Sequence, residues 1–161
     1  MVRFEPYRRR HRQACLAIFD ENCPRFFAPN EREDYAGFLD REHPDYRIGM
    51  VEGHIVGAFG LCPGQCDGEA HLNWILLSPS VQGRGLGRAI MAEVARHAQA
   101  RRVSRILIAA SHLSASFFAR FGARELRRTD HGWGPDMHRI DMVWELDLPF
   151  VDTAPPHGTR A

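Results

Sequence analysis

A glycine-rich turn between an apolar run and a long helical pattern constrains the fold more than any other stretch. The apolar run 71–77 stops at Pro79, and residues 82–88 then read Gln-Gly-Arg-Gly-Leu-Gly-Arg. Apolar residues spaced by four predict a helix from 85 to about 100. A strand that leads through such a turn into a helix leaves the first N–H groups of the helix unpaired at its positive end. The turn therefore predicts an anion site, because glycine lets a phosphate approach the backbone.

Two familiar nucleotide-binding turns fit this segment poorly. A dinucleotide-binding turn needs G-x-G-x-x-G and an acidic residue about 20 residues later. Here the glycines at 83, 85 and 87 alternate, and residues 105–108 are Arg-Ile-Leu-Ile. A P-loop needs Gly-Lys-Ser/Thr, which the turn lacks. From the short motif alone, a turn that only caps the helix stays open as an alternative.

Length and charge limit the class of protein. A chain of 161 residues predicts one compact domain, over 1–150, and the proline-containing segment 151–161 is expected to be a flexible tail. The net charge of +1 and the lack of a long apolar stretch argue against nucleic-acid and membrane partners. Without an export signal the four cysteines are expected to be reduced, in the cytoplasm. Cys62 and Cys66 lack two further well-spaced ligands, so no metal site is predicted.

The rest of the chain alternates strand and helix patterns. Predicted strands are 2–7, 46–51, 54–61, 69–77, 105–110, 124–127 and 138–148; predicted helices are 8–19, 31–41, 85–100 and a short one within 111–121. Asn30 is expected to cap the second helix. The apolar residues Met142 to Trp144 in the last strand belong either to a homodimer contact or to the core.

Two motifs together resemble the GNAT family of acetyl-CoA-dependent N-acetyltransferases. Gln82–Gly87 is similar to its pyrophosphate turn, Gln/Arg-x-x-Gly-x-Gly/Ala, and Ser116–Ala123 resembles its Phe-Tyr-x-x-x-Gly-Phe segment. The order of the predicted elements resembles the family as well. The resemblance implies an α/β (α+β) fold with a mixed, mostly antiparallel central sheet of about six or seven strands, flanked by about four helices. It also implies a splay between the fourth and fifth strands.

The resemblance further implies acetyl transfer from acetyl-CoA to a primary amine of a small molecule or peptide, by direct attack on the thioester. The turn would hold the diphosphate, and the open strand edge at 75–77 would pair with the pantetheine arm. The cofactor-binding residues implied are Ile75, Leu76, Leu77, Gln82, Gly83, Arg84, Gly85, Leu86, Gly87, Arg88, Ser111 and Phe118.

The catalytic residues that the resemblance implies are His71 and Asn73. His71 falls where one branch of the family carries a glutamate and another the first of two histidines, and Asn73 falls on the second. An imidazole can act as a base near neutral pH. The alternatives are a histidine with no chemical role and Glu69 as the base. Phe118 falls where the family usually has the tyrosine expected to act as the general acid, and phenylalanine cannot donate a proton. A catalytically weak or inactive acyl-CoA-binding sensor or scaffold is therefore the second hypothesis.

Two loops are expected to select the substrate. Phe26 and Phe27 lie in the proline-rich loop 24–32, and Trp133 lies in the polar loop 130–136. In the family's fold both loops would lie over the thioester, and the three rings would bound an apolar pocket. For the two phenylalanines, a role in the core is the alternative that the sequence slightly favours.

Overall fold

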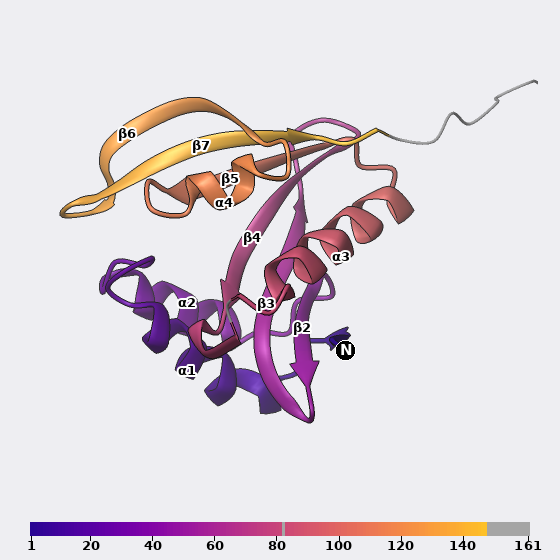
Figure 1. The fold of residues 1–161 in the computed structure, drawn as a ribbon, viewed down its shortest axis with the longest axis vertical. Helices are drawn as coiled ribbons and strands as arrows, with labels where there is room; N and C mark the ends of the chain where they lie inside the picture. The colour runs from indigo at the N-terminus through magenta and orange to yellow at the C-terminus, as the bar shows by residue number, and fades with distance from the viewer. Residues whose placement is uncertain (82, 148–161) are drawn as a thin grey trace, which may run out of the picture.

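The computed structural model describes residues 1–81 and 83–147, which form one sheet with helices on both faces (Figure 1). Gln82 and the predicted tail 151–161 lie outside the described residues. The described strands are β1 (Arg3–Pro6), β2 (Tyr46–Val51), β3 (His54–Pro63), β4 (Glu69–Leu77), β5 (Arg105–Ser111), β6 (Arg124–Gly134) and β7 (Met137–Glu145). The described α-helices are α1 (Arg12–Asn22), α2 (Glu31–Leu39), α3 (Leu86–Ala100) and α4 (Ala115–Ala119).

The sheet confirms the predicted fold class. Its strand order in the described chain is β1-β2-β3-β4-β5-β7-β6. Only the β4–β5 pair is parallel, and the other five described pairs are antiparallel. A parallel pair needs a crossover, which α3 supplies over one face of the sheet (Figure 1).

The β4 and β5 strands separate partway along their length. They pair only where Glu69–Leu72 faces Arg105–Ile108. Beyond Leu72, β4 continues beside β3 and β5 continues beside β7, so the two halves of the sheet diverge (Figure 1). A bulge accompanies the separation: Trp74 has a φ of 42°, and the β3–β4 register shifts by one residue there. Such a bulge bends the strand and increases its local twist.

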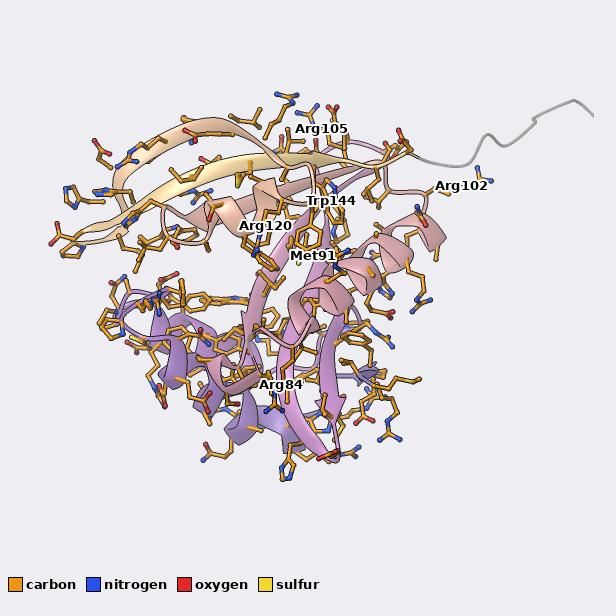
Figure 2. The ribbon with its side chains drawn as sticks, viewed as in Figure 1. Arg84, Met91, Arg102, Arg105, Arg120 and Trp144 are labelled. Atoms are coloured by element: carbon orange, nitrogen blue, oxygen red, sulfur yellow. The ribbon has the colours of Figure 1, made fainter. Side chains whose placement is uncertain are left out.

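Two hydrophobic cores hold the diverging halves in place. One core packs α3 and α4 against the sheet, and it includes Met91 of α3 and Trp144 of β7, both labelled in Figure 2. The predicted stripe of α3, Leu86, Ile90, Val94 and Ala98, is buried as expected. The second core packs α1 and α2 around Phe19, Tyr35 and Tyr46. Several side chains are fully buried on each face of the sheet, and their burial stabilises the position of β4 between the two layers of helices.

The last two strands correct one sequence-based expectation and decide between the two alternatives for Met142 to Trp144. The polar segment 130–136, predicted as a loop, is mostly strand, because β6 runs to Gly134 and β7 begins at Met137. The β7 strand lies between β5 and β6, and Met142 to Trp144 are buried in the core rather than offered at a dimer edge. Across the described ranges, every helix is too short or too polar to cross a membrane.

The start of α2 also differs from expectation. Asn30 makes no side-chain cap, and its Nδ2 donates instead to the carbonyl of Trp133 at 3.0 Å. The backbone N–H of Ala28 donates to Oε2 of Glu31 at 2.7 Å, which satisfies a group before the helix. The loop ahead of α2 is thereby tied to the tip of the β6–β7 hairpin, two segments about a hundred residues apart in the chain.

Candidate functional site

A cavity of about 800 Å³ opens where β4 and β5 separate. Its walls are residues 72–77 of β4 and 108–111 of β5, and α4 and the segments before α2 and α3 complete it. The remaining lining residues are Asn22, Phe26, Phe27, Glu31, Gly83, Gly85, Gly87, Arg88, Ile90, Leu113, Ser114, Ser116, Phe117, Phe118, Arg120, Phe121 and Trp133. A hollow of this size at a break in a sheet can hold a small-molecule ligand.

The glycine-rich turn presents its backbone to this cavity. Gly83 and Gly85 have φ values of 81° and 75°, in the left-handed region that side chains disfavour. A Cβ built on either residue would meet nothing within 4 Å, so the space over the turn is open. Gly87 is different, because a Cβ there would meet Phe117 Cε2 at 2.7 Å. The turn and the N-terminus of α3 thus form an open cradle that fits a phosphate group.

Most of the predicted cofactor residues lie along one continuous wall. Those lining the cavity are Ile75, Leu76, Leu77, Gly83, Gly85, Gly87, Arg88, Ser111 and Phe118. Arg84 is exposed and lies outside the lining (Figure 2). Leu86 is buried in the protein, and Gln82 lies outside the described residues. The hydroxyl of Ser111 is already 3.0 Å from that of Ser114, within the turn that leads to α4.

The predicted catalytic pair is divided between two hollows. Asn73 lines the large cavity, and its Nδ2 donates to Sγ of Cys62 at 3.3 Å. His71 is exposed and lines a separate hollow of about 310 Å³ beside Leu107 and Asp141. Both residues follow the two-residue period of the strand, but His71 lies where β4 still pairs with Leu107 of β5. Asn73 is the first residue beyond that pairing.

The three predicted substrate-binding rings all line the same cavity. Phe27 lies 6.3 Å from Trp74, measured between ring centroids. Trp133 donates from Nε1 to the carbonyl of Ala110 at 2.9 Å, so its ring is fixed against β5. The guanidinium of Arg139 lies 4.9 Å from the centroid of the same ring. The loop before α2 and the hairpin tip therefore meet over one part of the cavity.

Sequence reasoning missed two charged groups in the lining, Glu31 and Arg120. Glu31 is 7% exposed, and its burial raises the pKa of the carboxyl group, although the hydrogen bond from Ala28 N–H opposes the rise. A glutamate in the first turn of a helix is normally solvated and stabilised by the helix dipole. The residue type at position 31 therefore did not indicate a buried site residue. Arg120 lies at the end of α4, with its guanidinium 5.6 Å from the centroid of the Phe117 ring.

The sequence model of the acetyltransferase (GNAT) family matches residues 15–123, and the chain belongs to that family. No curated protein matches the chain significantly in sequence. No group of three metal-binding side chains occurs among the residues that the structure describes.

Solved structures show the same fold at low sequence identity. The ribosomal-protein-S18-alanine N-acetyltransferase of Escherichia coli has a TM-score of 0.73 at 16% identity, over 94% of this chain and 98% of that chain. An aminoglycoside 6′-N-acetyltransferase complexed with coenzyme A has a TM-score of 0.72 at 11% identity, over 93% and 99%. Ard1 from Thermoplasma volcanium has a TM-score of 0.75 at 9% identity, over 90% and 97%.

Proposed function

We propose that this protein is an acetyl-CoA-dependent N-acetyltransferase acting on a primary amine of a small molecule or peptide. The observation that carries the proposal is the separation of β4 from β5 after Leu72, which opens the cavity beside an unobstructed glycine turn. Membership of the GNAT family supports acetyl transfer as the reaction class. The proposed location is the cytoplasm, where the four cysteines would remain reduced.

The cavity wall supplies the groups that acetyl-CoA requires. Bound acetyl-CoA would provide the activated thioester. Backbone N–H groups of the turn at 83–88 would bind its diphosphate, and Arg88 and Arg120 would add positive charge. The edge of β4 at 75–77 has no β5 partner in the described register, so its backbone can pair with the amides of the pantetheine arm. Phe118 would pack against that arm.

The acceptor nitrogen must be neutral to attack the thioester carbonyl directly. We propose His71 as the base, acting through water because its imidazole lies in the neighbouring hollow. Asn73, inside the cavity and on the same strand face, would orient that water. Unchanged turnover in His71→Ala would discard this role for His71 without affecting the assignment of the reaction.

A second function remains a distinct hypothesis because Phe118 cannot donate a proton to a leaving thiolate. An acyl-CoA-binding sensor or scaffold would bind coenzyme A and transfer no acetyl group to any amine. Thiolate is a tolerable leaving group, with an ordinary thiol pKa of about 8.5, so an enzyme can work without that donor.

Two experiments separate these functions. Thermal shift with coenzyme A, ATP and NAD tests the binding site, because a ligand of the native state raises the melting temperature by mass action. Coenzyme A should stabilise the protein most, and a larger effect of ATP or NAD would contradict the assignment. Thiol release from acetyl-CoA with a panel of amines then tests for turnover.

A further inference from the structure

One buried carboxylate in the cavity has no partner of opposite charge. Glu31 is 7% exposed, and no Lys, Arg or His nitrogen of the described residues lies within 4.0 Å of its carboxylate oxygens. The adjacent cation, Arg32, is held away by Asp20, which accepts from its Nε at 2.7 Å and its Nη2 at 3.1 Å. A buried carboxylate without a counter-charge is costly, and the hydrogen bond from Ala28 N–H offsets only part of that cost. A cationic ligand in the cavity would offset more of it.

Charge is divided across the lining of the cavity. Glu31 is the only acidic residue among the described residues that line it. The lining arginines come from elsewhere, Arg88 from the first turn of α3 and Arg120 from the end of α4. The α3 and α4 side suits an anion, whereas the α2 side suits a cation.

Aromatic rings line the same cavity. Phe26, Phe27, Trp74 and Trp133 line it together with Glu31. The segment is held in place, because Asn30 bonds to Trp133 and Ala28 bonds to the Glu31 carboxylate. A cavity that offers both a carboxylate and aromatic rings can bind an ammonium group, since rings attract cations through their negative faces.

We propose that Glu31 binds the ammonium group of the acceptor and that the acceptor is a cationic primary amine with an apolar body. This proposal rests on the proposed acetyltransferase function and names its substrate class. Glu31 pairs with the protonated amine as it enters, and the aromatic rings cover the carbon skeleton beside it. The nearby titratable groups are Cys23 and Asp34. The negative charge of Glu31 acts on the Cys23 thiol, and the like charge of Asp34 repels that of Glu31.

A purely structural role for Glu31 makes a different prediction. Its Oε2 accepts the Ala28 N–H, as a glutamate near a helix N-terminus often does. Glu31→Gln keeps an oxygen that can accept this hydrogen bond and removes only the charge. A structural role therefore predicts that Glu31→Gln changes nothing in amine selectivity. Glu33→Gln is the matched control, since Glu33 lies in the same first turn but is exposed and outside the cavity lining.

The test uses two isomeric amines. Benzylamine is a cation at neutral pH, and 4-methylaniline is uncharged at the same pH. We expect kcat/KM for benzylamine to fall about tenfold in Glu31→Gln, the factor that corresponds to 1.4 kcal/mol. The value for 4-methylaniline and the affinity for coenzyme A should change less than about twofold, and Glu33→Gln should match the wild type. An equal loss for both amines, or no loss for either, would overturn the role of Glu31.

Binding separates failure of this proposal from failure of the proposed function. Benzylamine should raise the melting temperature of the coenzyme A complex in the wild type and have little effect in Glu31→Gln. Charge-selective binding without turnover would reject the transferase and keep the ammonium site. Turnover without charge selectivity in the wild type would reject the ammonium site and keep the transferase.

Discussion

Replacing Gly85 by alanine tests the glycine turn most sharply. Gly85 has a φ of 75°, which an alanine adopts at a cost of about 1 kcal/mol. A cost of that size lowers the melting temperature of a domain of this length by roughly 2–4 °C. A Cβ on Gly85 would meet nothing within 4 Å, so no steric term from the protein adds to the cost.

The effect of Gly85→Ala on coenzyme A should be larger than its effect on stability. The added methyl group enters the open space through which a diphosphate would approach the backbone. Losing one hydrogen bond to a charged group costs about 1.5–3 kcal/mol, which weakens binding by roughly 10- to 100-fold. Isothermal titration with coenzyme A measures this change directly.

Gly53→Ala is a matched control in the same fold. Gly53 has a φ of 80° and also meets nothing within 4 Å of an added Cβ, but it lies in the β2–β3 turn, away from the cavity lining. It should lose the same stability and retain full affinity for coenzyme A. If Gly85→Ala binds coenzyme A as tightly as Gly53→Ala does, the phosphate role of the turn is wrong.

Three further outcomes follow from the structure. Trp133→Phe should lose about 1 kcal/mol of stability with its hydrogen bond to Ala110 and raise the KM for the amine alone, as thermal melts and steady-state kinetics would show. Burial raises the pKa of Cys15 to about 11, so near pH 8 a disulfide reagent should modify exposed Cys66 at once and Cys15 only at the rate of unfolding. Burial raises the pKa of Glu31 above its unfolded value, so its contribution to stability is present at low pH and lost as pH rises through the folded pKa. The melting temperatures of Glu31→Gln and the wild type should therefore be alike near pH 4, and that of the variant should be higher near pH 8. A difference between the two melting temperatures that does not depend on pH would contradict this.

The sequence predicted the scaffold well because its signals are local. The helical stripe of Leu86, Ile90 and Val94 and the glycines before α3 each depend on neighbours along the chain. The resemblance to the GNAT family then placed the splay, which the pairing of β4 with β5 confirms.

The contents of the cavity were harder to predict because they depend on contacts across the fold. The bulge at Trp74 and the end of β5 pairing at Leu72 decide that Asn73 lines the cavity and His71 does not. Glu31 is buried, and the residue before it, Asn30, is bonded to the hairpin tip from about a hundred residues away. The two-residue period of a strand, read from the sequence, cannot predict either of these features.

Backbone amide spectra of the protein with coenzyme A test the central claim most directly. The diphosphate of bound coenzyme A is proposed to lie on the turn that contains Gly83, Gly85 and Gly87, which line the β4–β5 cavity. At saturating coenzyme A, the amide signals of these three glycines should shift strongly, and that of Gly53 should stay in place. Shifts concentrated at other elements, with the three turn glycines unchanged, would contradict it.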